Sequence, residues 1–91
     1  MLHQYRVKLT AGQDCIVDGR YAIPVSIFMA AGTITGASGI DQATFGPPVA
    51  QTITAGSVSP VDPTKLPISP WYKFTPTGGG GCIVMQERVS R

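Results

Sequence analysis

Residues 5–10 (YRVKLT) alternate between hydrophobic and polar side chains, with the hydrophobic ones at odd positions. A period of two predicts an antiparallel strand with one buried face and one face in water. The short apolar segment 15–17 (CIV) predicts a second strand. Asp18-Gly19 follows it, a pair that is typical of tight hairpin turns.

Residues 21–30 (YAIPVSIFMA) predict a longer strand. Pro24 cannot donate a ladder hydrogen bond, so it indicates a sheet edge or a β-bulge. In a regular pleat Ile23, Val25 and Ile27 would share one face. A helix over 26–31 is the competing interpretation, but its short length and the glycine after it argue against it.

The middle of the chain predicts brief strands divided by glycine and proline. They lie within 32–39 (GTITGASG), 43–45 (ATF) and 49–55 (VAQTITA). Residues 57–70 then hold four prolines, which fix φ and favour an extended backbone. We expect an extended arm or a long connection there, with apolar side chains laid on a surface.

Residues 71–75 (WYKFT) predict an aromatic strand with Tyr72 and Phe74 on one face. We expect Trp71, Tyr72 and Phe74 to form a core cluster under the proline-rich segment; a stacking platform for sugars or bases made by the same rings is the alternative. The glycines 78–81 predict a flexible hairpin tip that joins this strand to a closing strand at 82–89 (CIVMQERV). The fold class is therefore all-β: one domain over residues 1–91, a small antiparallel β-sandwich or barrel with an extended proline-rich arm or loop at 57–70.

The stretch 21–61 contains one formal charge, Asp41, and the whole chain of 91 residues is only 13% charged. A small domain has a high surface-to-volume ratio and cannot bury such a stretch by itself. We therefore predict that much of this surface contacts another protein. The predicted interface residues are Ile23, Val25, Phe28, Ile34, Phe45, Val58, Val61, Leu66, Ile68 and Trp71.

The net charge of +2 is small and the basic residues lie mostly at the two ends, which argues against nucleic-acid binding. No apolar run is long enough to span a membrane. The first nine residues (MLHQYRVKL) lack the apolar segment of a signal peptide, so we do not expect secretion by that route.

Nothing in the sequence has the pattern of a catalytic or metal site. The glycine run is followed by strand residues and not by the Lys and Ser/Thr of a phosphate loop. His3 is the single histidine, and the carboxylates form no spaced pair. We predict no enzymatic activity, no metal and no cofactor. Cys15 and Cys82 are expected to be small buried residues, and whether they pair stays open.

The uncharged stretch 21–61 and the proline-rich segment 57–70 resemble the small decoration or cement proteins of tailed bacteriophage heads. The resemblance implies a β-rich module on the outside of a capsid, often a trimer near local threefold axes, that strengthens contacts between major capsid proteins. It implies a virion location, the major capsid protein or another virion protein as partner, and a homo-oligomer with a trimer favoured. The alternatives are a phage tail, adaptor or fibre component, and a bacterial β-sandwich module that binds carbohydrate through Trp71 and Tyr72.

Overall fold

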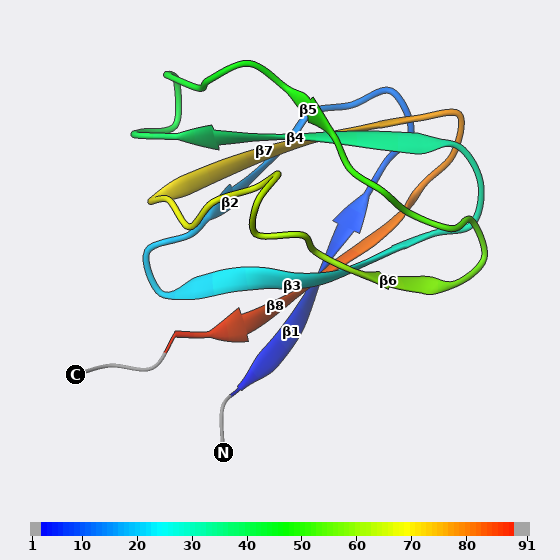
Figure 1. Cartoon of the computed structure of the whole chain (residues 1–91), viewed down its shortest axis with the longest axis horizontal. Coiled ribbons are helices and arrows are strands. Elements are labelled where there is room, and N and C mark those ends of the chain that lie inside the picture. Colours follow the sequence, from blue (N-terminus) through cyan, green and yellow to red (C-terminus); the bar gives the residue numbers. More distant parts are fainter. Residues whose placement is uncertain (1–2, 89–91) are drawn as a thin grey trace.

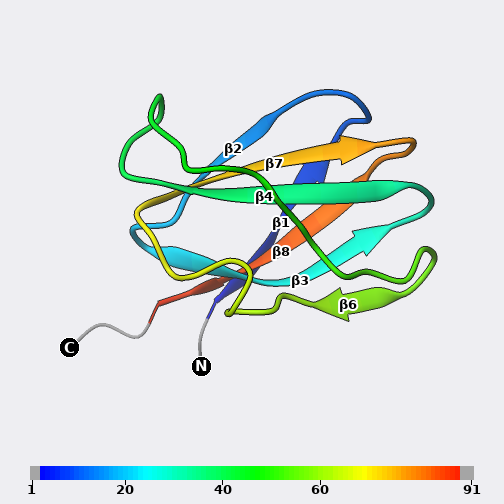
Figure 2. The same ribbon diagram turned by 45° about the horizontal axis from the view of Figure 1, so that its top comes forward.

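The computed structural model describes residues 3–88, which form eight β-strands and no helix. The strands are β1 (Gln4–Leu9), β2 (Cys15–Asp18), β3 (Ala22–Met29), β4 (Thr33–Gly39), β5 (Val49–Ala50), β6 (Val58–Pro60), β7 (Trp71–Thr77) and β8 (Gly81–Glu87). They make two four-stranded antiparallel sheets, in the orders β1-β8-β3-β6 and β2-β7-β4-β5 (Figures 1 and 2). The all-β prediction is confirmed, and none of the described residues forms a helix that could cross a bilayer.

The core lies between the two sheets, and in β7 it contains the alternate residues that the sequence indicated. In β7 the rings of Tyr72 and Phe74 are buried and stacked, with centroids 6.3 Å apart, as predicted. Trp71, the third ring of the predicted cluster, is only half-buried and lies outside the core. In β8 Ile83 and Met85 are completely buried. The other core members are Leu9, Val17, Ala22, Ile27, Met29, Ile34 and Leu66.

Two predicted hairpins are wrong. Asp18-Gly19 does not join paired strands, since β2 pairs with β7 while β3 pairs with β6 and β8. The glycine run likewise connects the two sheets, because β7 and β8 belong to different ones. A Cβ at Gly81 would collide with the Phe28 carbonyl oxygen, so glycine permits a close backbone approach here. Val89, the last residue of the predicted closing strand, lies outside the described residues.

Pro24 marks a β-bulge in β3, as its position in the sequence indicated. Pro24 is opposite Met85 and Ser26 is opposite Val84, so Val25 is the extra residue. The bulge reverses the alternation: Pro24 is buried before it and Ile27 after it. Ile23 and Ile27 therefore do not share a face, which corrects the prediction from a regular pleat. The alternative helix over 26–31 is also wrong, because residues 26–29 belong to β3.

The segments predicted as brief strands differ in length from expectation. β4 runs for seven residues across the glycines, whereas only Val49 and Ala50 of the segment 49–55 are in a strand. Residues 43–45 contribute a single bridge, between Phe45 and Gly39. Within 57–70, β6 pairs with β3 and Leu66 enters the core, so this segment lies against the body of the domain.

Candidate functional site

An apolar groove lies where β6 stops pairing with β3. The two strands pair from Ser26 to Phe28, and a last hydrogen bond joins the Val61 N–H to the Val25 carbonyl at 3.1 Å. Pro24 and Pro63 have no N–H groups with which to continue the ladder. The segment after β6 therefore diverges from β3 and leaves an open groove between the two sheets.

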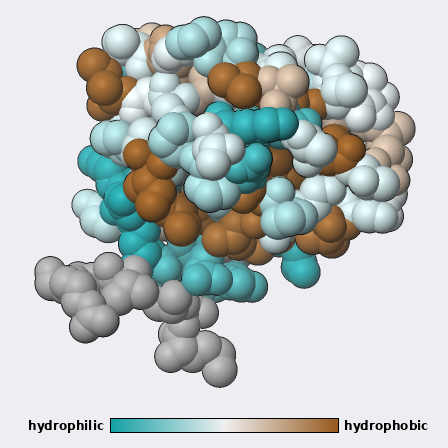
Figure 3. Space-filling model, in the orientation of Figure 1, coloured by the Kyte–Doolittle hydropathy of each residue, from teal (hydrophilic) through white to brown (hydrophobic). Residues whose placement is uncertain are grey.

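Side chains from three segments line this groove, whose volume is about 210 Å³. The lining residues are Ile23, Pro24, Val25, Val61, Pro63, Leu66, Ile68 and Tyr72. Pockets for drug-sized ligands usually measure about 300–1,000 Å³. The groove is therefore smaller than the pockets that usually bind drug-sized ligands. In Figure 3 hydrophobic surface gathers in a band over β3 and its border with the segment after β6.

A turn centred on Asp62 holds the far wall of the groove. The Asp62 carboxylate accepts hydrogen bonds from the N–H and hydroxyl of Thr64, at 2.9 and 2.6 Å. The Asp62 carbonyl accepts from the N–H groups of Lys65 and Leu66, both at 3.0 Å. These contacts turn the chain so that the Leu66 side chain enters the core. The hydrogen bond from the Thr64 hydroxyl is also the main reason that the pKa of Asp62 is lowered.

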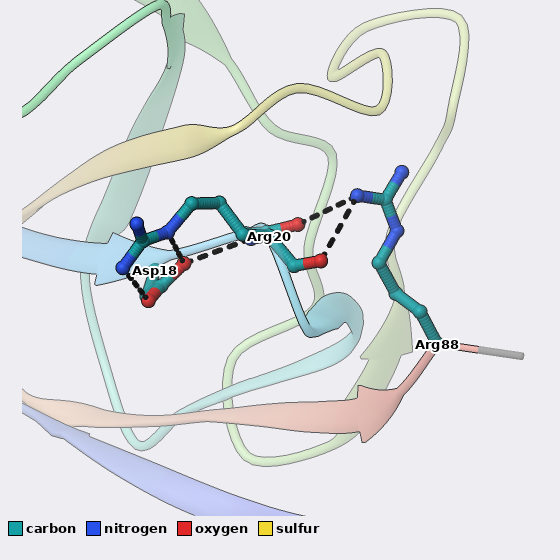
Figure 4. Close-up of polar contacts among 4 residues, drawn as sticks. Asp18, Arg20 and Arg88 are labelled. Carbon is teal, nitrogen blue, oxygen red and sulfur yellow. Dashed lines mark hydrogen bonds and ion pairs between the residues drawn. The ribbon is translucent and has the colours of Figure 1, made fainter. Parts of the chain in front are cut away.

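Asp18, Arg20, Tyr21 and Trp71 form a cluster of charged and aromatic side chains at the β2–β3 connection, the arginine cluster. Figure 4 shows its polar contacts. Asp18 and Arg20 form a two-point ion pair, with nitrogen-to-oxygen distances of 3.1 and 2.9 Å. The Arg20 guanidinium lies 5.4 Å from the ring centre of Tyr21 and 5.1 Å from that of Trp71. Hydrogen bonds from Arg20 lower the pKa of Asp18. Arginine, tyrosine and tryptophan are the residues most often found at interface hot spots.

Arg88 fixes the backbone beneath this cluster. Its guanidinium donates to the carbonyl oxygens of Gly19 and Arg20, at 3.0 and 3.4 Å (Figure 4). The Arg88 N–H also donates to the Tyr21 carbonyl at 2.8 Å. Arg88, the residue directly after β8, thus holds the β2–β3 connection in place, and with it the backbone of Arg20 and Tyr21.

The ten predicted interface residues separate into groups. Five of them line the groove: Ile23, Val25, Val61, Leu66 and Ile68. Phe28 and Val58 are neighbours on the outer face of the first sheet, and Trp71 belongs to the arginine cluster. Phe45 packs over Gly39 on the second sheet, where Lys73 lies 5.1 Å from its ring centre. Ile34 is a core residue with 1% exposure, and Leu66 has 3%, so both offer a partner almost no surface.

Sequence reasoning did not single out several exposed apolar side chains. Tyr21 is 71% exposed and directly precedes β3, and Ile40 is 74% exposed and directly follows β4. Their signal was weak because each is one large side chain beside polar turn residues. The neighbouring Asp18-Gly19-Arg20 segment was interpreted only as turn chemistry. Its charged pair is what places Arg20 beside two aromatic rings.

Both cysteines are free thiols. Cys15 is half-buried against the core, and burial raises its pKa. Cys82 lies opposite Lys8 and Phe28, in the centre of the first sheet. The two residues belong to different sheets and form no disulfide.

No family model, curated protein or solved structure matches this chain. Within residues 3–88 no group of three or more His, Cys, Asp or Glu side chains is placed to hold a metal ion. Tyr72 is 1% exposed, so it cannot form a sugar-stacking platform with Trp71 in this conformation. The groove and the arginine cluster are therefore the candidate binding surfaces.

Proposed function

We propose that this chain is a structural assembly protein of a virion, a decoration or cement protein that binds and stabilises an assembled phage head. The observation that carries the proposal is the convergence of five predicted interface residues on one apolar groove, to which all but the buried Leu66 offer accessible surface. They come from β3 and from the segment after β6, which are far apart in the sequence. A groove of side-chain size suits an apolar anchor from a neighbouring subunit.

The proposed mechanism is burial of apolar surface across a seam between capsid subunits. The groove accepts side chains of the major capsid protein, and the exposed arginine–aromatic cluster adds contacts at the β2–β3 end. A protein that binds the assembled shell and not its dissociated subunits stabilises that shell by mass action. We propose a homo-oligomer, with a trimer favoured, because several copies at one local symmetry axis would contact several subunits at once.

Co-sedimentation with capsids tests this function. Purified chain is mixed with empty heads assembled from the major capsid protein encoded in the same genome, and the pellet is assayed for stoichiometric binding. We expect the wild type to co-sediment with the heads and to raise the temperature at which they disassemble. Wild-type protein that stays in the supernatant contradicts the proposal. Binding to purified tails instead would assign the chain to the tail, adaptor or fibre class.

Two matched variants locate the contact. Ile68→Glu places a charge in the groove, whereas Ile40→Glu places one outside it, and the two side chains are 60% and 74% exposed. We expect Ile68→Glu to abolish co-sedimentation and Ile40→Glu to retain it. Because both side chains already contact water, neither substitution should unfold the domain.

A further inference from the structure

β1 is an open edge of the first sheet. It pairs only with β8, and no strand among residues 3–88 pairs with its other side. With six residues it is longer than the other edge strands, β2, β5 and β6, which have four, two and three. It contains no proline, and its pairing with β8 has no bulge. Such an edge offers its backbone groups to an added strand.

The direction of the free backbone groups follows from one hydrogen bond. The Glu87 N–H donates to the His3 carbonyl at 2.8 Å, next to the β1–β8 ladder. Antiparallel ladders alternate, so the odd-numbered residues of β1 direct their backbone groups toward β8. Gln4, Arg6 and Lys8 therefore direct theirs to the open edge. The contact of the Cys15 thiol with the Lys8 carbonyl, at 3.9 Å, lies on that open side and agrees with this assignment.

The two faces of β1 carry different chemistry. Arg6 and Lys8 are exposed on the outer face, and neither forms a salt bridge with any residue of the described range 3–88. Tyr5 and Val7 lie on the inner face, where Tyr5 is 46% exposed because no strand continues the sheet beyond it. A shallow hollow of about 280 Å³ next to this edge is lined by Gln4, Tyr5, Arg6 and Val84.

A second copy of β1 is a poor partner for this edge. Directly opposed residues of an antiparallel pair point to the same face, so a symmetry-related β1 centred on Arg6 or on Val7 would place Arg6 opposite Arg6 or Lys8. Like charges in opposed positions are destabilising. Cations on an edge strand are a common protection against self-pairing. A strand with carboxylates at the opposed positions would instead be attracted.

We propose that β1 accepts an extended segment of another protein in which acidic and apolar residues alternate. The backbone groups of Gln4 and Arg6 extend the sheet to the added strand. Its carboxylates lie opposite Arg6 and Lys8, and its apolar side chains cover the exposed part of Tyr5. The proposal goes beyond the assembly function above, because the edge is separate from the groove. Success or failure at the groove does not decide it.

Peptide binding tests the charge requirement. A short labelled peptide of alternating Glu and Val is compared with one of alternating Lys and Val by fluorescence anisotropy. We expect the Glu–Val peptide to bind at least about tenfold more tightly, since two opposed charge pairs change from repulsive to attractive. In the double variant Arg6→Glu, Lys8→Glu the preference should reverse. Equal binding of the two peptides to the wild type overturns the proposal.

A second pair of variants tests the backbone requirement. Gln4→Pro removes an N–H that points to the open edge and leaves the ladder to β8 intact, whereas Gln4→Ala keeps that N–H. We expect the proline variant to bind the Glu–Val peptide about tenfold more weakly than the alanine variant. Thermal unfolding of both variants verifies that they are folded. If Gln4→Pro does not fold, the charge reversal at Arg6 and Lys8 decides alone.

Two further outcomes contradict the proposal. Peptide binding that is unaffected by Gln4→Pro in a folded protein would place the peptide elsewhere. A concentration-dependent dimer of the wild type that Gln4→Pro abolishes would assign the edge to a second copy of this chain. Sedimentation equilibrium on the two Gln4 variants distinguishes that case from binding of a different protein.

Discussion

The guanidinium carbon of Arg20 lies 5.1 Å from the centre of the Trp71 ring. Arg20 follows β2, and Trp71 is the first residue of β7, the strand that pairs with β2. Asp18 holds Arg20 in this position, because its carboxylate accepts hydrogen bonds from both the backbone and the side chain of Arg20. Trp71 is the single tryptophan of the chain, so its fluorescence reports on this cluster alone.

Removing the guanidinium should expose the Trp71 ring to water. We expect Arg20→Gln to shift the emission maximum of the folded protein to longer wavelength, because the cation over the ring is lost. Arg6→Gln removes a cation from β1 and should leave the spectrum unchanged. Identical spectra for Arg20→Gln and the wild type would contradict the contact.

The Asp18–Arg20 pair should make the free energy of unfolding depend on pH in the acidic range. The pKa of Asp18 in the folded chain lies below its ordinary value of 3.8, mainly because Arg20 donates hydrogen bonds to the carboxylate. The stabilisation is therefore complete above the ordinary value and is lost as the pH falls through the lower, folded value. We expect the melting temperature to fall more steeply between about pH 5 and pH 2 for the wild type than for Asp18→Asn. Parallel curves would show that the pair contributes nothing.

Leu66 and Ile68 line the same groove but differ in burial. Leu66 is 3% exposed and belongs to the core, while Ile68 is 60% exposed. We expect Leu66→Ala to lower the free energy of unfolding by about 2–4 kcal/mol, because it leaves a cavity. Ile68→Ala should change it by less than about 0.5 kcal/mol. Urea denaturation measures both, and equal effects would mean that the segment after β6 does not pack as described.

Gly81 should tolerate no side chain. A Cβ there would overlap the Phe28 carbonyl oxygen of the neighbouring strand β3. We expect Gly81→Ala to destabilise the domain by about 1–3 kcal/mol or more, since backbone must move to relieve the overlap. Gly46→Ala is the matched control, because its Cβ would meet only the Ser38 carbonyl oxygen, at 3.7 Å. Its effect should stay within about 0.5 kcal/mol. Equal stability of Gly81→Ala and Gly46→Ala would contradict the close approach of Gly81 to the Phe28 carbonyl oxygen.

The Cys15 thiol should react slowly in the folded protein. Burial raises its pKa above the ordinary value of 9.0, so little thiolate forms near neutral pH. We expect alkylation of Cys15 by iodoacetamide at about pH 8 to be much slower in the folded chain than in urea-unfolded chain. Peptide mapping measures the rate at Cys15 and also counts free thiols, of which two are expected. Equal rates in the two states would contradict the burial of Cys15.

Part of the candidate site could be predicted from sequence. The shortage of charge over 21–61 led to a predicted interface of ten residues, and five of them line one groove. Ile34 and Leu66 were indistinguishable from the others in sequence, yet both are buried in the core. Apolarity alone cannot separate residues that stabilise the domain from residues that are free to bind, because both purposes favour the same side chains. Tyr21 was missed because it is a single large side chain beside polar turn residues, and such a residue forms no pattern along the sequence.

The sequence by itself determined the all-β class and several of the strands, and in β1 and β7 it also indicated the buried face. Alternation is a local property of the extended backbone, so β1, β7 and β8 could be recognised from a few neighbouring residues. Only the tertiary structure decided which strands pair. β7 and β8 are joined by four glycines and look like a hairpin, but they belong to different sheets. Pairing depends on contacts between residues distant in sequence and on close backbone approaches such as that of Gly81 to Phe28, and no local pattern encodes these.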